Sequence, residues 1–474
     1  MSIRRWILII FLLPIIACSD GRLGFMTQDQ IEFHGDLKEF KQRGTIRVVT
    51  DYNAINYFIY KGLEIGYQYE LLQAMSKDLG LKLELVISND IQRNYDSLFD
   101  GKVDLIATNI SINNDLPADF SYTEPHSYSR QVLVQRKGSE SVYFDSLTHQ
   151  FNRLVRNQLD LAKKVVHVQK NSSYYQRLVA LQNEIGDSIS IIEEPDYTVE
   201  QLIALVSSGE IDYTVCDENF AQVNQNFYPN IDIETAISFQ QKIAWVVRTN
   251  SPEFNKAVND WLLKFRHSYG YSKIYQKYFV NRRTVYVGKI ESTFIVDNKV
   301  SVFDDILKEE SKLLDWDWRL LASLVYQESR FDPEAESWAG AGGLMQLMPE
   351  TAQRFGVTSI TSPRDNIKGG VRYLQWLQTK INPKVSVHTE RIKFILASYN
   401  AGLGHVLDAM RLAEKYGKNP KVWTDNVDYY MLNKSLPEFY NDTIVKCGYC
   451  RGEEPYKYVV EVLERYEEFK KRLH

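Results

Sequence analysis

Short apolar runs alternate with amphipathic segments through the first half of the chain. "TIRVVT" and "LKLELVI" have the β-branched character of strands, and "YQYELLQAMSKDLG" between them has helical spacing and ends at a glycine. The helix-then-strand order returns in "NYDSLFDGKVDLIATNI" and "TVEQLIALVSSGEIDYTVCDENF". This alternation predicts α/β architecture. "RQVLVQRKG" and "KIAWVVRTN" predict two strands at the places where the chain crosses between two lobes.

From residue 301 the pattern becomes helical almost throughout. The main predicted helices are "SVFDDILKEESKLL", "WRLLASLVYQES", "PETAQRF", "NIKGGVRYLQWLQTKI", "ERIKFILASYNAG" and "YKYVVEVLERYEEFKKRL". A chain of 474 residues is too long for one ordinary core. We therefore expect an α/β two-lobed domain over residues 44–281 and a mainly α domain over residues 301–474, joined by a linker at 282–300.

The first 17 residues have the pattern of a secretory signal. "MSIRR" is basic, "WILIIFLLPII" is apolar, and "IAC" ends the segment at Cys18. "IIAC" resembles a bacterial lipobox, which implies that Cys18 is lipid-modified and begins the mature chain, with residues 18–43 as a linker. An uncleaved anchor or a plain secretory signal are the alternatives. Ser19 does not resemble an inner-membrane retention signal, so we expect a lipid anchor in the outer membrane, facing the periplasm.

Charge and cysteine content exclude other classes of function. The net charge of −5 provides no general basic field for nucleic acid. Cys447 and Cys450 in "CGYC" would suit a small local disulfide, but no second ligand pair accompanies them for a metal. We expect no metal site and no cofactor.

One acid interrupts the apolar face of "WRLLASLVYQES". That face carries Leu320, Leu321, Leu324 and Val325. The next position on it is Glu328, where an acid usually reaches water or forms half of a buried ion pair. The Asp332–Pro333 pair predicts the end of the helix, because proline disfavours helical geometry at the residue before it. Glu328 is therefore expected in the last turn, facing the core beside a loop.

The loop after Glu328 is suited to a ligand. Three glycines in "WAGAGGLMQ" allow backbone to approach a bound molecule closely. Burial penalises a charged carboxyl, so an apolar site would favour a glutamic acid that stays protonated and can protonate a glycosidic oxygen. Such enzymes normally use a second carboxylate. Asp332, Glu334 and Glu336 offer none with a fixed direction toward Glu328.

"ESRFDPEAESWAGAGGLMQLMPETA", followed by "DNIKGGVRYL", "ASYNAGLGHV" and "EPYKYVVEVL", resembles the family 1 soluble lytic transglycosylase domain of lysozyme-like fold. The resemblance implies that Glu328 acts on peptidoglycan strands, first as acid at the β-1,4 bond between N-acetylmuramic acid and N-acetylglucosamine, then as base at the muramoyl O6. The N-acetyl group of the substrate would replace the second carboxylate. The product would carry a 1,6-anhydro ring, which makes the enzyme a lyase.

The same resemblance implies a set of substrate contacts: Ser337, Met345, Gln346, Tyr399, Asn400 and Tyr458. Core packing is the alternative for Tyr399 and Tyr458, and helix capping is the alternative for Asn400. We interpret Asn366 as a helix cap, not as part of the chemistry.

The first half resembles the amino-acid-binding periplasmic solute-binding proteins of family 3. The matching features are Gly66–Glu70, "DGKVDLIATNISI", "DFSYTEP", "SGEIDYTVCD" and "YSKIYQKYF". The resemblance implies a cleft between two lobes, in which Asp217 would receive an amino group and Tyr52 would form an aromatic wall. "SINNDLPADFS" lacks the arginine that grips a carboxylate in that family. A peptide or muropeptide fragment, another small molecule, or no ligand at all are the alternatives.

Three functions compete. The first is a lipid-anchored lytic transglycosylase of the cell envelope, used in cell-wall remodelling or turnover, with a regulatory or ligand-sensing first domain. The second is a hydrolytic muramidase on the same scaffold. The third is a solute or muropeptide sensor whose catalytic domain is inert. The presence of Glu328 together with every accompanying motif favours the first.

Overall fold

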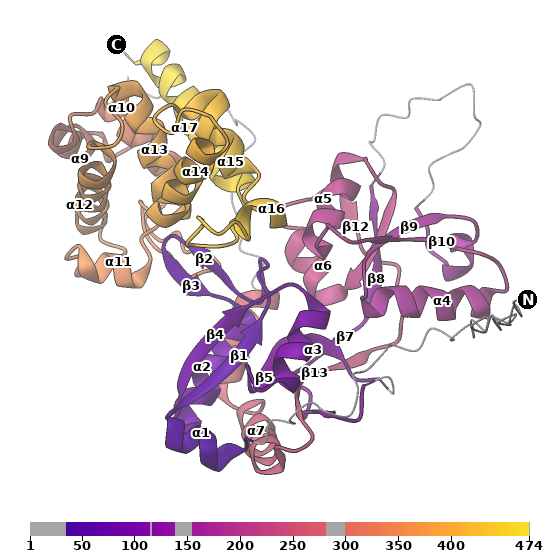
Figure 1. The fold of residues 1–474 in the computed structure, drawn as a ribbon. Coiled ribbons are helices and arrows are strands. Elements are labelled where there is room, and N and C mark those ends of the chain that lie inside the picture. The colour runs from indigo at the N-terminus through magenta and orange to yellow at the C-terminus, as the bar shows by residue number, and fades with distance from the viewer. Residues whose placement is uncertain (1–34, 114–115, 138–153, 281–298, 474) are drawn as a thin grey trace, which may run out of the picture.

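The computed structural model describes residues 35–113, 116–137, 154–280 and 299–473 (Figure 1). The expected signal segment, Cys18 and most of the predicted linker 282–300 lie outside the described residues. Within the described part, no helix is both long and apolar enough to cross a membrane.

The first lobe (residues 35–129 and 241–280) is built on a six-stranded sheet. Its strand order is β4-β1-β5-β13-β6, with β7 also paired to β13. Strand β1 is parallel to β4 and β5, whereas β13 returns antiparallel from the second lobe. The elements are α1 Leu37–Arg43, β1 Thr45–Thr50, β2 Phe58–Tyr60, β3 Leu63–Ile65, α2 Tyr67–Leu79, β4 Lys82–Ile87, α3 Ile91–Phe99, β5 Leu105–Ser111, β6 Phe120–Tyr122, β7 Ser127–Ser129, β13 Gln241–Arg248, α7 Pro252–Phe265, α8 Tyr269–Tyr275 and the π-helix η2 Gln276–Val280.

The second lobe (residues 131–137 and 154–240) has a five-stranded sheet in the order β10-β9-β11-β8-β12. The chain enters it between β7 and β8 and leaves it before β13, as the two crossing strands predict. Its elements are β8 Gln131–Arg136, η1 Gln158–Leu161, β9 Val165–Gln169, α4 Ser173–Ile185, β10 Ser190–Glu194, α5 Val199–Ser208, β11 Tyr213–Asp217, α6 Glu218–Asn224 and β12 Ile231–Asp232.

The helical domain (residues 299–473) packs around a separate apolar core. Its elements are α9 Asp304–Glu310, η3 Ser311–Leu314, α10 Trp318–Ser329, α11 Pro349–Arg354, α12 Pro363–Ile381, α13 His388–Ala401, α14 Leu403–Lys415, the π-helix η4 Trp423–Val427, α15 Asp428–Leu432, α16 Pro437–Tyr440 and α17 Glu453–Arg472. The predicted fold class, an α/β two-lobed part followed by a mainly α part, is confirmed.

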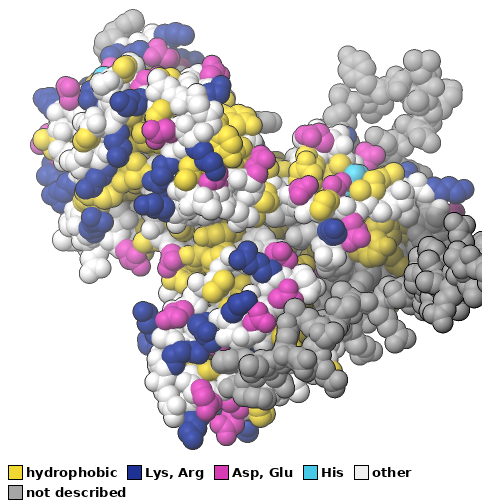
Figure 2. Space-filling model, viewed as in Figure 1, with side chains coloured by type: hydrophobic (Ala, Val, Ile, Leu, Met, Phe, Trp, Pro, Cys, Tyr) yellow, Lys and Arg dark blue, Asp and Glu magenta, His cyan; other side chains and the backbone are white. Residues whose placement is uncertain are grey.

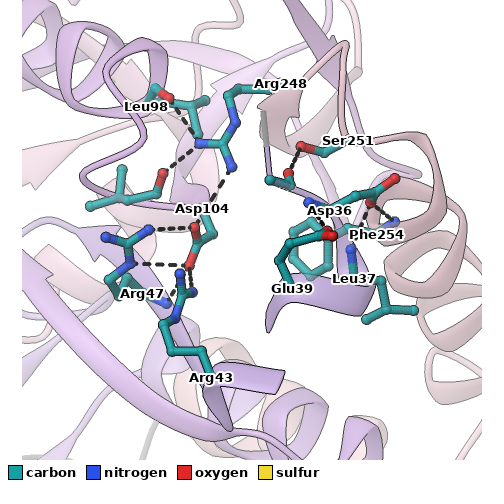
Figure 3. Close-up of polar contacts among 12 residues, drawn as sticks. Asp36, Leu37, Glu39, Arg43, Arg47, Leu98, Asp104, Arg248, Ser251 and Phe254 are labelled. Atoms are coloured by element: carbon teal, nitrogen blue, oxygen red, sulfur yellow. Dashed lines mark hydrogen bonds and ion pairs between the residues drawn. The ribbon is translucent and has the colours of Figure 1, made fainter. Parts of the chain in front are cut away.

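Two carboxylates anchor the start of the described chain to the first lobe (Figure 3). Asp36 accepts the backbone N–H of Leu37 at the start of α1 and that of Phe254 at the start of α7, at 2.8 and 2.7 Å. Asp104 is fully buried and pairs with Arg43 and with Arg47, the latter at 3.0 Å. A buried carboxylate is stable only with such partners, so this cluster fixes α1 against β1 and β5.

The hairpin of β2 and β3 leaves the first lobe and reaches the helical domain (Figure 1). Phe58 and Ile65, a cross-strand pair of this hairpin, belong to the same buried apolar cluster as Ala341 and Met348 of the helical domain. In Figure 2, apolar side chains gather at the seam between the two bodies. Removal of this apolar surface from water stabilises the contact.

Candidate active site

Glu328 lies at the end of α10, on its buried face. The Asp317 carboxylate caps the helix start by accepting the Arg319 N–H at 2.9 Å. The helix ends at Ser329, because Arg330 and Phe331 adopt left-handed φ values of 53° and 63°. The prediction that Asp332–Pro333 ends the helix was wrong by three residues, since proline constrains only its immediate predecessor. The expected position of Glu328 in the last turn is confirmed.

Glu328 has a partner on each carboxylate oxygen. Oε1 accepts the Tyr458 hydroxyl of α17 at 2.8 Å, and Oε2 pairs with Lys61 Nζ at 3.0 Å. The side chains of Glu328 and Lys61 are each 7% exposed, so the pair is shielded from solvent screening. Burial and the nearby Glu328 charge raise the pKa of Tyr458 well above its usual value, which keeps its hydroxyl a donor.

Lys61 belongs to the first lobe and was not among the predicted site residues. It is at the tip of the β2–β3 hairpin, where Lys61 and Gly62 have φ values of 48° and 82°. Two consecutive positive φ values are those of a type I′ turn. Lys61 Nζ also donates to the Gln346 carbonyl at 3.1 Å and lies 5.4 Å from the centre of the Tyr399 ring. "YKGL" between two short β runs signals a turn, but no local pattern indicates that its tip enters another domain.

Asn366 holds the glycine loop beside the acid. Its Oδ1 accepts the Met345 N–H at 2.7 Å, and its Nδ2 donates to the carbonyls of Gly342 and Ile360 at 3.0 and 2.9 Å. The N-cap of α12 is Ser362, so the interpretation of Asn366 as a helix cap was wrong. The Asn366 side chain points from inside α12 to the loop, where it pairs the buried Met345 N–H and adds a donor to the Gly342 carbonyl, which also accepts the Leu347 N–H.

The other predicted contacts divide into two groups. The Tyr399 hydroxyl donates to the Met345 carbonyl at 2.7 Å, and Gln346 Nε2 donates to its own loop at Ala335 and Gly343, both at 2.9 Å. These residues lie around Lys61 and Glu328. Two other predicted contacts, Ser337 and Met345, contact neighbouring parts of the helical domain. Ser337 Oγ accepts the Ala341 N–H at 2.9 Å, and a Cβ on Gly370 would lie 2.2 Å from Met345 Sδ.

A small cavity of about 40 Å³ lies between the hairpin and the helical domain. Asn400 lines it, together with Tyr60, Trp338, Arg451 and Glu454. Glu454 is one turn before Tyr458 on α17, and burial raises its pKa to about 7. Glu454 was not among the predicted cleft residues. Its spacing of four from Tyr458 was the available signal.

Asp51 of the first lobe and Asp217 of the second lobe both lie near Tyr174. Burial raises the pKa of Asp217 to about 7 and that of Asp51 to about 6, and the Tyr174 hydroxyl bonds to Asp217. Burial, together with the charges of both acids, raises the pKa of Tyr174 well above its usual value. Asp51 was missed, although it directly follows strand β1. Tyr52 packs against Tyr440 and Tyr449 of the helical domain, with ring centres 5.9 and 6.4 Å away.

Cys447 and Cys450 are free thiols in this structure. Burial raises the pKa of Cys450 to about 12, so that thiol is a poor source of thiolate. The loop that carries both cysteines contacts the first lobe, where a Cβ on Gly448 would lie 2.2 Å from the Tyr52 hydroxyl.

Comparison with known proteins gives two family matches. Residues 305–422 match the transglycosylase SLT domain, and residues 45–281 match the bacterial extracellular solute-binding proteins of family 3. Among curated relatives, membrane-bound lytic murein transglycosylase F of Desulfosudis oleivorans is 32% identical over 92% of both chains. The protein of that name from Vibrio cholerae is 30% identical over 96% of this chain and 85% of its own. Among solved structures, an ancestral arginine-binding protein bound to arginine is 24% identical, covers 50% of this chain and 99% of its own, and has a TM-score of 0.41.

Proposed function

The chain belongs to the membrane-bound lytic murein transglycosylase F family, and from this premise we propose that it cleaves peptidoglycan without water and leaves 1,6-anhydromuramic ends. It is a lytic murein transglycosylase of the cell envelope, and peptidoglycan is its substrate. The proposal adds the reaction course, the residues that carry it and the role of the first domain.

Glu328 acts twice in the proposed reaction. It first donates a proton to the oxygen of the β-1,4 bond, so that the C1–O bond breaks and N-acetylglucosamine leaves with its 4-hydroxyl. The substrate's N-acetyl carbonyl stabilises the positive charge at C1. The Glu328 carboxylate then takes the proton of the muramoyl O6 hydroxyl, and O6 bonds to C1. Tyr458 would hold the carboxyl in place, and Ser337, Met345, Gln346, Tyr399 and Asn400 would frame the sugars.

The observation that carries the proposal is the position of Glu328 on a buried helix face with the Tyr458 hydroxyl 2.8 Å away. The acids that follow it in the chain, Asp332, Glu334 and Glu336, are all exposed. A mechanism in which the substrate supplies the second stabilising group needs one such acid, not two.

The proposal includes a blocked resting state. An ion pair with Lys61 requires Glu328 to be ionised, and an ionised carboxylate has no proton to donate. The first domain therefore acts as a regulator, and release of the hairpin tip frees the acid. A muropeptide or another small ligand in the lobe cleft, with an amino group at Asp217 and an apolar part at Tyr52, would favour release. The proposal assigns this regulator to residues 44–281, catalysis to residues 301–474, and an outer-membrane lipid anchor to Cys18.

Mass spectrometry of digested sacculi tests the reaction. Long digestion with the full chain should release fragments with 1,6-anhydromuramic ends, and Glu328→Gln should release none, because the amide has no acidic proton. Glutamine has nearly the shape of glutamate, so an unchanged far-UV circular dichroism spectrum with cooperative unfolding is the control for folding, whereas loss of the ion pair with Lys61 should lower the melting temperature. Reducing ends from the wild type would identify a hydrolase, and anhydro ends from Glu328→Gln would refute the role of Glu328.

A further inference from the structure

Arg451 lies where the helical domain meets the second lobe. Its Nη2 pairs with Glu200 of α5 and donates to Asn224 Oδ1 at 3.1 Å. Its guanidinium lies 3.4 Å from the centre of the Phe227 ring. The side chains of Arg451 and Glu200 are only 9% and 7% exposed. This contact is therefore a buried, desolvated ion pair between two bodies of the molecule.

Glu200 also contacts the first lobe. Its second oxygen, Oε2, accepts the backbone N–H of Ala54 at 3.3 Å. Ala54 begins the segment that runs into the hairpin at Phe58 and so to Lys61. One carboxylate of the second lobe thus joins the base of the blocking hairpin to the helical domain. A movement of the second lobe relative to the first would break at least one of these two bonds.

A second carboxylate lies close to Arg451 on the other side. Glu454 Oε1 is 4.0 Å from Arg451 Nε, and both residues line the small cavity beside the hairpin. Within the described part of the chain, Arg451 Nε and Nη1 have no hydrogen-bond partner. The arginine therefore has unused donors that face a cavity and a nearby acid, and Glu454 is one turn from the tyrosine that bonds the catalytic acid.

We propose that Arg451 is a latch with two carboxylate partners: it holds Glu200 while the hairpin blocks Glu328, and it turns to Glu454 when the second lobe moves. This proposal rests on the blocked resting state proposed above. A buried guanidinium cannot lose its closest carboxylate without a large cost, so a closer approach to the second carboxylate is the low-energy route. The exchange gives the two-state element that coupling between distant sites requires.

Hydrogen–deuterium exchange of the hairpin amides, residues 58–65, tests the latch in the full chain without substrate. Glu200→Gln removes the charge that holds Arg451 in the blocked state, so hairpin exchange should be at least about 5-fold faster, the lower end of typical coupling between sites. Glu454→Gln removes the alternative partner, so hairpin exchange should be slower than in the wild type. Glu184→Gln is the matched control, because it breaks another arginine pair of the second lobe, with Arg177, at the surface.

The latch is supported if hairpin exchange becomes faster in Glu200→Gln and slower in Glu454→Gln, while Glu184→Gln exchanges like the wild type. Unchanged exchange in Glu200→Gln, or a shift of both variants in the same direction, overturns it and leaves an ordinary structural ion pair. If Glu200→Gln does not fold, Arg451→Lys tests the same contact, since lysine keeps the charge but cannot bond Glu200 and Asn224 as a planar fork, and the same exchange criterion applies. If hairpin exchange is unchanged in the variants while the wild type still releases anhydro ends from sacculi, the latch alone is refuted. If the wild type releases no anhydro ends, the proposed reaction is refuted.

Discussion

Asp217 is a buried acid of the second lobe with little to stabilise its charge. It ends β11, and its backbone precedes α6 without a side-chain capping bond. Burial raises its pKa from 3.8 to about 7, and the bond from Tyr174 offsets that effect only in part. A group of this kind stores free energy that a ligand with an ammonium group can recover.

The pH dependence of stability should report this acid. Because its folded pKa is above its unfolded pKa, the folded state holds the proton between about pH 4 and pH 7, and stability falls as the pH rises through that window. Asp217→Asn should therefore be more stable than the wild type at pH 8, by on the order of 4 kcal/mol, with a much smaller difference at pH 4. Urea unfolding at the two pH values measures it.

Asp212→Asn, at an exposed acid of the same lobe, is the control and should change little. An equal effect of Asp217→Asn at both pH values would show that its stabilisation does not come from titration.

At the level of single residues, the sequence identified those whose local pattern is unusual. Glu328 was found because it interrupts an apolar helix face. Lys61 and Arg451 were not found, because a lysine in a turn and an arginine in a loop are ordinary in sequence. Their importance arises from partners 267 and 251 positions away, which only tertiary structure brings together.

The glycine loop and helix α12 form one structural element through Asn366. The loop's backbone turns sharply, with Gln346 at a φ of 46°, and the Asn366 side chain adds to the loop's own backbone bonds by accepting the Met345 N–H. The positions of Gln346 and Tyr399 both depend on this loop, since the tyrosine hydroxyl bonds to its Met345 carbonyl.

A pair of alanine variants should separate loop support from helix capping. Asn366→Ala leaves the buried Met345 N–H and the part-buried Ile360 carbonyl without their partner, and a buried group without a partner costs about 1–3 kcal/mol. Ser362→Ala removes the actual cap of α12 and should cost about 1 kcal/mol. Urea unfolding should rank Asn366→Ala as clearly more damaging, and its sacculus digestion should fall more. Equal losses of stability would contradict the assigned role.

Regular elements were predictable where their signals are local. Helix α2 ends at Gly80 as expected, since that residue adopts a left-handed φ of 69°, and strands β1 and β4 coincide with the β-branched runs. The end of α10 was missed because two non-glycine residues take positive φ, a conformation that the surrounding tertiary structure imposes. The turn at Lys61 and Gly62 is indicated by the local sequence, but no local pattern indicates that the β2–β3 hairpin contacts the helical domain.

In the whole molecule, the β2–β3 hairpin brings the first lobe to Glu328 of the helical domain, beside the contacts that Tyr52 and Glu200 make with that domain. The Lys61 ammonium bonds to Glu328 and the Gln346 carbonyl and lies over the ring of Tyr399, so the tip of the first lobe contacts the carboxylate that we propose as the catalytic acid. His405 Nε2 contacts the Ile59 carbonyl at 3.2 Å and gives the hairpin a second polar attachment. Burial lowers the pKa of His405 to about 3, so this attachment does not depend on a charged imidazole.

The most direct measurement is the initial rate at which the full chain releases 1,6-anhydro fragments from sacculi, compared between the wild type and Lys61→Ala. Removal of one partner from a buried ion pair strongly destabilises the arrangement that contains it, so the hairpin should leave the site. The exposed Lys256→Ala should match the wild type, and Lys61→Ala combined with Glu328→Gln should be inactive. We predict a rate at least about tenfold higher for Lys61→Ala, which corresponds to a shift of about 1.4 kcal/mol. A rate equal to or below that of the wild type would contradict the account.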